Sequence, residues 1–243
     1  TIDVKISIAH LLNNNYVLPN ISIDSKFPFI ICNNVWHPII GKNNSIKNNF
    51  CIKDNNITIL TGPNQAGKST FMRSIMTCLV LSQSLGISPC DNIYFTPFNK
   101  LHTYVNIPDS IGRESLFEAE TNRCFEYLKK INNNYFSFGI IDELFTGTES
   151  NSGMSCTKAV IENIKKYKNS ISLISTHFTQ ICDIENVNYL KFIAEKNKNG
   201  LYTFPYKVFF GISNQNIAID ILRQKGYNID IINLAQSYLL KFK

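Results

Sequence analysis

The sequence predicts an α/β domain with a mostly parallel central sheet flanked by helices. Two observations support this fold class. Apolar runs of strand length alternate with longer helical segments along most of the 243 residues, which is typical of parallel strands joined by crossover helices. In addition, residues 61–70 read TGPNQAGKST between a predicted strand and a predicted helix, which is the setting of a phosphate-binding loop.

The N-terminal part of the chain is predicted to contain one helix and several short strands. Residues 2–12 place Ile2, Ile6 and Ala9 at near-helical spacing, so we expect the end of a helix that enters the domain from elsewhere. Residues 13–28 carry Asn and Pro and are predicted to be a loop. Short apolar runs predict strands at residues 29–34, 45–52 and 57–60.

After the glycine-rich loop, strands and helices are predicted to alternate. Residues 69–86 are predicted to form a helix that ends at Gly86. Residues 115–131 are predicted to form another, opened by Ser115 and Glu118 as a capping box. Further strands are predicted at residues 101–105, 136–142, 171–176, 189–194 and 202–210. Further helices are predicted at residues 153–167 and from about 216 to the C-terminus with a break at 226–228, and a turn with a helix is predicted near 178–184.

The composition indicates a folded chain in a reducing, intracellular compartment. Hydrophobic residues make up 44%, which suits a packed core, and no run of about 18 apolar residues predicts a membrane span. Seven cysteines, odd in number and without C-x-x-C spacing, argue against disulfides or zinc. The net charge of +6 is compatible with nucleic acid but common elsewhere. Thr1 fits either a piece of a longer chain or a cleaved N-terminus.

The loop itself indicates nucleotide binding. Its glycines allow backbone N–H groups to turn toward phosphate oxygens, and the following helix adds a positive dipole. Lys68 would then bridge the β- and γ-phosphates, while the Ser69 hydroxyl would bind Mg²⁺. A chance match is the alternative, which the flanking strand and helix disfavour. The predicted nucleotide contacts are Gly62, Pro63, Asn64, Gln65, Ala66, Gly67, Lys68, Ser69 and Thr70.

A second element is the apolar strand that ends in Asp142 and Glu143. Ligands in open α/β sheets lie at the carboxyl ends of the strands. Asp142 therefore suits Mg²⁺, and Glu143 suits positioning of the attacking water. The ordinary alternative is a strand that ends in solvated acids, and the phosphate-binding loop upstream favours the functional interpretation.

Two further elements each have two interpretations. His177 follows the strand at residues 171–176 and could hydrogen-bond a γ-phosphate or only cap a turn. Ser115 could be an ordinary helix cap, or the free N–H groups of its helix could hold an anion such as the γ-phosphate of a nucleotide on another subunit. The residues alone leave both questions open.

In this order, the elements resemble the ATPase domain of the MutS family of DNA mismatch-recognition proteins, within the ABC-type ATPases. The resemblance implies a P-loop NTPase fold, with residues 1–28 as a lead-in helix and loop from the lever region and residues 29–243 as the ATPase domain. The similar segments are IDVKISIAHLL (2–12), VWHPII (35–40), TGPNQAGKSTFMRS (61–74), SLFEAE (115–120), IIDELFTGTES (140–150), STHF (175–178) and the closing segment 206–236.

The resemblance implies Mg²⁺-dependent ATP hydrolysis. Lys68, Glu143 and His177 would be catalytic, and Ser69 and Asp142 would hold the metal.

The resemblance also implies partners. The ATPase domains of the family pair head to tail as homo- or heterodimers, so Ser115 would contact the γ-phosphate in trans. Tyr206 would pack beside the adenine, and residues near Ser45 and Ile46 would line the other side of the base. ATP would switch a clamp on double-stranded DNA, which parts outside this chain would contact, and no membrane is involved. A mismatch-reading wedge domain is missing from this chain.

The chain departs from the family pattern at five positions. Gln65-Ala66 replaces Met-Gly, Phe145-Thr146 replaces Gly-Arg, and Ser152 replaces Asp. These changes put the coupling between paired sites in doubt. They keep open a second hypothesis, a nucleotide-holding dimerisation module with little turnover. A third, an ABC-type ATPase of a non-repair system, is disfavoured because SLF (115–117) stands in place of a Leu-Ser-Gly-Gly signature.

Overall fold

The computed structural model describes residues 2–105 and 115–241. The residues outside this range are Thr1, 106–114, 242 and 243. The start of the predicted segment 1–28 and the end of the predicted domain 29–243 therefore lie outside the described residues. The α-helices are α1 Ile2–Asn13, α2 Lys68–Leu85, α3 Leu116–Lys130, α4 Ser150–Ile164, α5 Ala218–Gln224 and α6 Ile229–Lys241, with a 3₁₀ helix, η1, at Thr179–Ile181. None of these helices is both long and apolar enough to cross a bilayer.

The central sheet has six strands and confirms the predicted α/β class. Its strands are β4 Ile57–Thr61, β6 Lys100–Tyr104, β7 Ser137–Asp142, β8 Ser170–Ser175, β9 Asn188–Lys191 and β12 Phe209–Phe210. They are ordered β12-β9-β4-β8-β7-β6. All neighbouring pairs are parallel except β12 and β9. The register places Asp142 opposite Ser175 at the carboxyl end of the sheet.

A second, four-stranded sheet packs beside the first. Its strands are β1 Asn20–Ile21, β2 Ile30–Val35, β3 Asn48–Ile52 and β5 Asn92–Phe95, and their order is β1-β5-β2-β3. Strands β2 and β3 were predicted, whereas β1 falls in the predicted loop and β5 was not anticipated. Two short strands, β10 Glu195–Lys196 and β11 Tyr202–Thr203, form a separate antiparallel pair.

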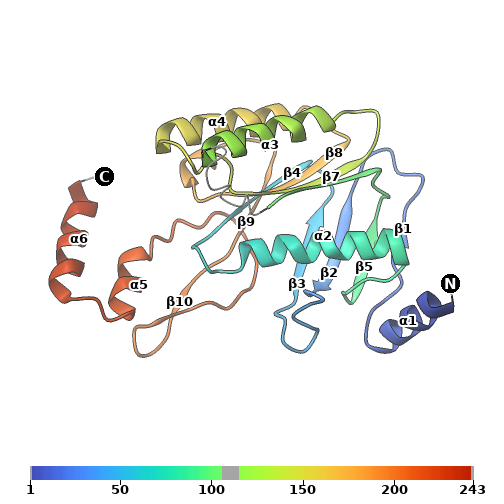
Figure 1. The fold of residues 1–243 in the computed structure, drawn as a ribbon, viewed down its shortest axis with the longest axis horizontal. Helices are drawn as coiled ribbons and strands as arrows, with labels where there is room; N and C mark the ends of the chain where they lie inside the picture. Colours follow the sequence, from blue (N-terminus) through green and yellow to red (C-terminus); the bar gives the residue numbers. More distant parts are fainter. Residues whose placement is uncertain (1, 106–114, 242–243) are drawn as a thin grey trace.

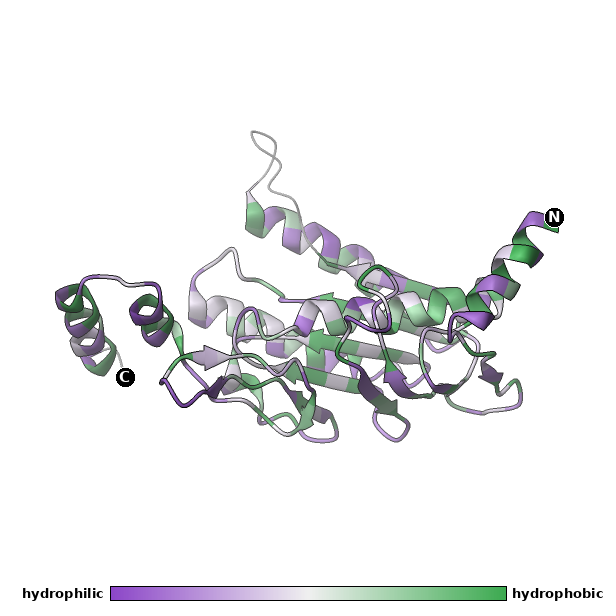
Figure 2. Ribbon diagram, turned by 90° about the horizontal axis from the view of Figure 1, so that it is seen from below, coloured by the Kyte–Doolittle hydropathy of each residue, from purple (hydrophilic) through white to green (hydrophobic). Residues whose placement is uncertain are grey.

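Helices cover both faces of the central sheet. Figure 1 shows α3 and α4 on one side and α2 on the other, and Figure 2 shows apolar stretches along the strands in the middle of the molecule. Because successive strand residues point to opposite faces, Ile59 joins the core beneath α3 and α4. Its neighbour Leu60 joins the core that α2 and the second sheet share. The loop that joins β4 to α2 therefore starts from a strand buried along its whole length.

Three predicted elements need correction. Residues 202–210 do not form one strand: they divide into β11 and β12, because Pro205 has no N–H for a ladder and Tyr206 adopts a left-handed φ of 54°. The helix predicted at 153–167 begins earlier, at Ser150, because the Glu149 side chain accepts hydrogen bonds from two N–H groups of its first turn. Near residues 178–184 only the short η1 forms.

Candidate functional site

The loop between β4 and α2 requires glycine at both ends. Gly62 has a φ of 145°, and a Cβ there would lie 2.8 Å from the carbonyl oxygen of Phe192. Gly67 has a φ of 103°, and a Cβ there would lie 3.1 Å from Cδ1 of Tyr206. The first α2 residue is Lys68. The backbone therefore turns where the motif predicts, with the helix N-terminus facing the loop.

The unusual pair in the loop adopts two different conformations. Gln65 has a left-handed φ of 69°, which costs an L-residue about 1 kcal/mol or more. Ala66 is fully buried and is not among the left-handed residues of the described chain. A methyl group is therefore tolerated at Ala66, as expected for a negative φ, and the strain in the loop lies at Gln65.

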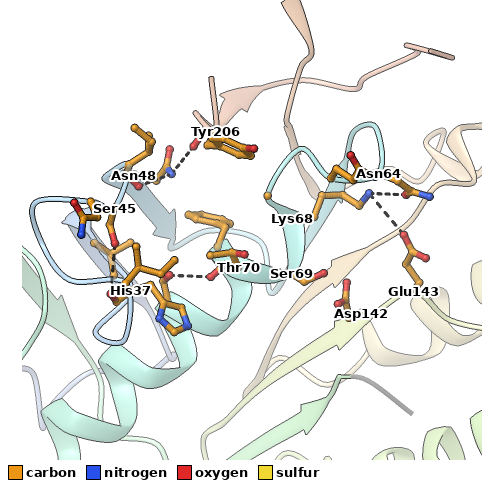
Figure 3. A pocket seen from close by; sticks show the side chains of 18 of the residues that line it. His37, Ser45, Asn48, Asn64, Lys68, Ser69, Thr70, Asp142, Glu143 and Tyr206 are labelled. Carbon is orange, nitrogen blue, oxygen red and sulfur yellow. Dashed lines mark hydrogen bonds and ion pairs between the residues drawn. The ribbon is translucent and has the colours of Figure 1, made fainter. Parts of the chain in front are cut away.

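Lys68 points back over the loop. Its side chain is 5% exposed, and Nζ donates to the Gly62 carbonyl at 2.9 Å and lies 3.4 Å from Oδ1 of Asn64. Nζ also lies 3.6 Å from Oε1 of Glu143. Figure 3 shows this lysine between the loop and the carboxylate. A buried cation with these acceptors is a fixed positive charge at the position where phosphate oxygens would bind.

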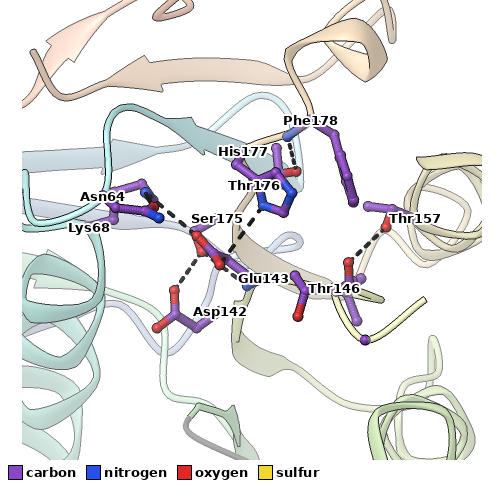
Figure 4. Close-up of polar contacts among 12 residues, drawn as sticks. Asn64, Lys68, Asp142, Glu143, Thr146, Thr157, Ser175, Thr176, His177 and Phe178 are labelled. Carbon is purple, nitrogen blue, oxygen red and sulfur yellow. Dashed lines mark hydrogen bonds and ion pairs between the residues drawn. The ribbon is translucent and has the colours of Figure 1, made fainter. Parts of the chain in front are cut away.

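Asp142 and Glu143 share one hydroxyl. The Ser175 side chain donates to Oδ1 of Asp142 at 2.6 Å and accepts from the Glu143 N–H at 3.1 Å. Glu143 adopts a left-handed φ of 56°, so its side chain leaves the strand direction. Figure 4 shows the dashed contact between this serine and Asp142. The structure thus brings Asp142, Glu143 and Lys68 together, as the sequence predicts.

These groups line one end of a cavity of about 920 Å³. Most of the predicted site residues line this cavity. They are Asn64, Gln65, Gly67, Lys68, Ser69, Thr70, Asp142, Glu143 and Tyr206, together with Ser45 and Ile46. The predicted Gly62, Pro63 and Ala66 do not line it. Gly62 and Pro63 line a neighbouring cavity of about 580 Å³, together with His177.

Another wall of the cavity is built around Tyr206. Its backbone carbonyl accepts a hydrogen bond from Nδ2 of Asn48 at 3.0 Å, and Oδ1 of Asn48 accepts from the Val208 N–H at 2.9 Å. Asn48 is 8% exposed and also donates to the Ile46 carbonyl at 3.3 Å. One asparagine therefore ties the Tyr206 loop to the opposite wall of the cavity (Figure 3).

His177 lies beside Glu143. Its Nδ1 is 3.9 Å from Oε2 of Glu143, beyond hydrogen-bond distance, and its ring centroid is 4.1 Å from that of Phe178. The turn that follows is capped by Thr176, whose hydroxyl accepts the Phe178 N–H at 3.0 Å. The side chain that caps this turn is therefore that of Thr176, and His177 contributes its carbonyl, which accepts the Thr179 N–H at 3.1 Å.

Ser115 forms the predicted helix cap. Its hydroxyl accepts the Glu118 N–H at 3.2 Å, and its side chain is exposed. Ser115 itself does not line the large cavity, although Leu116 and Glu120 of the same helix do. The cap interpretation is confirmed, and the role in trans stays a prediction.

Comparison with known protein families matches residues 58–243 to the family described as MutS domain V. The chain belongs to the MutS family. It is 28% identical over 239 residues to the DNA mismatch repair protein MutS of Clostridium botulinum, covering 94% of this chain and 25% of that protein. It is 27% identical over 257 residues to the protein of that name from Streptococcus thermophilus, covering 100% and 29%. The chain thus spans only a quarter to a third of these MutS relatives.

The departures from the MutS pattern have visible structural consequences. Phe145, where the pattern has glycine, is 6% exposed and left-handed, with a φ of 55°. Its ring packs 6.0 Å from that of Phe117. Ser152 donates its N–H and hydroxyl to Glu149. The pKa of Glu149 is lowered by the hydrogen bond from the Asn151 N–H and then by those from the Ser152 N–H and hydroxyl. The chain has thus replaced these family residues with side chains that have partners of their own.

Two residues that sequence reasoning did not single out also belong to the site. His37 lines the cavity near Ser45, and burial, with the nearby Arg73 charge, lowers its pKa. Glu120 is 2% exposed and accepts hydrogen bonds from Thr146 and Gly147. His37 falls within the VWHPII stretch and Glu120 within SLFEAE. These two motifs could therefore have pointed to both residues.

The structure also gathers three of the scattered cysteines. Cys32, Cys78 and Cys90 are at most 1% exposed, and their sulfur atoms lie within 4.8 Å of one another. They come from β2, α2 and the segment before β5, so spacing in the sequence could not reveal them. They lie in the apolar core beneath α2.

Proposed function

We propose that this chain is the ATP-binding and ATP-hydrolysing domain of a MutS-like DNA mismatch repair or recombination protein, with a P-loop fold of the ABC type. The observation that carries the proposal is the arrangement of one cavity of about 920 Å³. Lys68, Asp142 and Glu143 line one end of it, and Tyr206 lines another wall. A cavity of this size with a few convergent polar groups suits a ligand such as a nucleotide.

ATP would lie along this cavity. The backbone N–H groups of the loop and the N-terminus of α2 would face its phosphates, and Lys68 would replace its contact with the Gly62 carbonyl by contacts with the β- and γ-phosphates. The adenine would pack against Tyr206, with Ser45 and Ile46 on its other side. The ring of Tyr206 offers an apolar face for such packing.

Mg²⁺ fits the donors that the cavity offers. The Ser69 hydroxyl and the Asp142 carboxylate both line it, and oxygen donors of this kind suit a small hard cation. When bound, the ion supplies positive charge against the β- and γ-phosphate oxygens. Ser175 holds one carboxylate oxygen of Asp142, which fixes how this side chain faces the cavity.

Hydrolysis would depend mainly on Glu143. Its carboxylate would accept a hydrogen bond from the attacking water and orient it toward the γ-phosphorus. The bond to the β–γ bridging oxygen would break, so ADP and phosphate leave, while Lys68 balances the charge on the phosphates. His177 would hydrogen-bond the γ-phosphate from its position beside Glu143.

The remaining predictions concern the larger assembly. Residues 1–28 would lead in from the lever region, and residues 29–243 would form the ATPase domain. Two such domains would pair as a homo- or heterodimer, with Ser115 reaching the γ-phosphate of the partner's nucleotide. Closure of this dimer would switch a clamp on double-stranded DNA, which other parts of the protein would contact. The name of the relatives, DNA mismatch repair protein MutS, supports a role in DNA mismatch repair.

A nucleotide-holding module with little turnover is the second candidate. The observation that favours it is the left-handed Phe145, two residues after Glu143, where the family pattern has glycine. A bulky residue in this conformation is uncommon, so the loop after Glu143 differs from the family's. Phosphate release distinguishes the two candidates.

Equilibrium binding of ATP in the presence of Mg²⁺ tests the shared part of both candidates. We expect wild-type protein to bind, and Lys68→Ala to lose binding because the buried ammonium is removed. Lys168→Ala is the matched control, since it removes the same charge from an exposed position. Absence of binding by the wild type, or equal affinity in Lys68→Ala, would refute nucleotide binding at this site.

A further inference from the structure

A buried carboxylate outside the predicted catalytic set holds the loop that follows Glu143. Glu120 lies on α3 and is 2% exposed. Its Oε1 accepts hydrogen bonds from the Thr146 N–H at 3.1 Å and from the Thr146 hydroxyl at 2.8 Å. Its Oε2 accepts from the Gly147 N–H at 3.1 Å. Among the described residues no lysine, arginine or histidine forms an ion pair with it, so three donors from one loop stabilise this carboxylate.

The same loop packs directly against the start of α3. A Cβ on Gly147 would lie 2.8 Å from the backbone nitrogen of Phe117 and 2.9 Å from Cγ of Leu116. The rings of Phe117 and Phe145 also pack together. Contacts on this side of the loop are therefore close, and only glycine allows the approach at Gly147.

Helix α4 fixes the opposite side of the loop. The hydroxyl of Thr157, which is fully buried, donates to the Leu144 carbonyl at 3.1 Å (Figure 4). A Cβ on Gly153 would lie 2.5 Å from the Phe145 carbonyl oxygen. The loop is thus held between two helices, α3 and α4.

The loop needs this support because its backbone is strained. Glu143 and Phe145 both have positive φ, at 56° and 55°, a region that L-residues rarely adopt. Such conformations persist only where the surroundings hold them. The position of the Glu143 carboxylate therefore depends on contacts made three and four residues further along, at Thr146 and Gly147.

We propose that Glu120 is a positioning residue for ATP hydrolysis, which holds Glu143 in its working position through Thr146 and Gly147. This inference rests on the proposed function. Glu120 also lies on α3, the helix that Ser115 caps. Its carboxylate therefore connects α3, whose N-terminus would contact the partner's nucleotide, to the loop that follows Glu143 in its own subunit. Movement of α3 on dimer closure would then reach Glu143 through this carboxylate.

Glu120→Gln in the full-length polypeptide tests the proposal. Glutamine has the same shape but turns an NH₂ group toward one of the loop donors, so the loop should shift. We expect kcat for ATP to fall about tenfold or more, while ATP affinity and the unfolding temperature stay close to wild type. Glu126→Gln is the matched control, because it makes the same change at an exposed position of α3, and it should keep wild-type kcat.

A second pair of variants decides the question if Glu120→Gln does not fold. Thr146→Val removes the hydroxyl donor but keeps the backbone N–H, and Thr146→Ser keeps both. We expect a lower kcat in Thr146→Val and recovery of most of it in Thr146→Ser, with ATP affinity unchanged in both.

Three outcomes contradict the inference or its basis. Equal kcat in wild type and Glu120→Gln, or in Thr146→Val and Thr146→Ser, overturns it. A parallel loss of kcat, affinity and thermal stability overturns it too, because that marks a purely structural role. If the wild type itself releases no phosphate, the proposed function fails and the inference fails with it, whereas an active wild type with unaffected variants contradicts the inference alone.

Discussion

The Lys68 ammonium lies 3.6 Å from Oε1 of Glu143, and both side chains line the same cavity. The same ammonium donates to the Gly62 carbonyl at 2.9 Å. One cation therefore connects the glycine-rich loop after β4 to the carboxylate directly after β7, and β8 lies between these two strands in the sheet. This pairing brings the proposed phosphate-binding charge and the candidate water-positioning group together.

Removal of the Ser175 hydroxyl should impair hydrolysis more than nucleotide binding. Ser175→Ala frees Asp142 and Glu143 from their shared partner, so we expect a several-fold loss of Mg²⁺-dependent phosphate release. Loss of these hydrogen bonds should also cost about 1–2 kcal/mol of unfolding free energy. Steady-state kinetics and denaturant unfolding measure the two effects.

Ser172→Ala provides the control for this change. Ser172 is buried on the same strand, but its hydroxyl pairs with that of Tyr127 at 2.7 Å, away from the carboxylates. It should lose stability to a similar degree and keep its turnover. Equal turnover losses in the two variants would show that strand stability, not the carboxylates, matters.

Asn48 should control the affinity for the base of the nucleotide. Asn48→Ala removes the hydrogen bonds to Tyr206 and Val208, so the Tyr206 loop would move away from the cavity. We expect about a tenfold weaker affinity for ATP, the equivalent of one good hydrogen-bond contribution. Titration with a fluorescent ATP analogue measures it, and Asn49→Ala, an exposed neighbour on the same strand, should bind normally. Unchanged affinity in Asn48→Ala would remove Tyr206 from the site.

The chain should lose stability in mild acid, partly through His102. Burial, with the charges of Lys130 and Lys100 nearby, lowers the pKa of His102 below 6.5, and its Nε2 is buried without a hydrogen bond. As the pH falls below about 6.5, the unfolded chain takes up a proton that folded His102 resists, so the free energy of unfolding falls until the folded pKa is passed.

A substitution at His102 tests this pH dependence. The ring packs edge-on against Tyr127 at 5.5 Å, so His102→Phe should keep the packing and remove the titration. We expect a flatter fall in the unfolding temperature between neutral pH and about pH 5, with part of the slope left because the pKa of His37 is lowered as well. An unchanged slope would show that His102 does not contribute.

Only the exposed cysteines should react in the folded protein. Cys51 and Cys156 are exposed, whereas the buried cluster of Cys32, Cys78 and Cys90 lies in the apolar core. Since alkylation requires access and a thiolate, we expect Cys51 and Cys156 to be modified quickly and the cluster only after unfolding. Mass spectrometry of the alkylated protein measures this. Fast labelling of any cluster cysteine would contradict the packing around α2.

Local motifs explain why much of the site could be predicted from the sequence. Gly62, Gly67, Lys68 and Ser69 lie in one short stretch of sequence, so their spacing alone predicts a phosphate-binding loop. The strand before Asp142 could be predicted because most of its residues are apolar. These elements need no knowledge of distant contacts.

The parts that could not be predicted depend on contacts between distant residues. Glu120 meets Thr146 across 26 residues, and Asn48 meets Tyr206 across 158. The predicted strand at 202–210 failed for a related reason, because Tyr206 takes a left-handed backbone conformation where Asn48 holds its carbonyl. Apolar periodicity does not register such tertiary constraints.

Steady-state phosphate release by wild type and Glu143→Gln, with ATP and Mg²⁺ at saturating concentrations, tests the central claim most directly. Glutamine keeps the shape of Glu143. Its neutral amide, however, cannot polarise the attacking water as the negatively charged carboxylate does. We predict turnover above background for the wild type, loss of about a hundredfold or more in Glu143→Gln, and ATP binding in both. Equal, background rates in the two proteins, with ATP still bound, would contradict hydrolysis and leave a module that only holds the nucleotide.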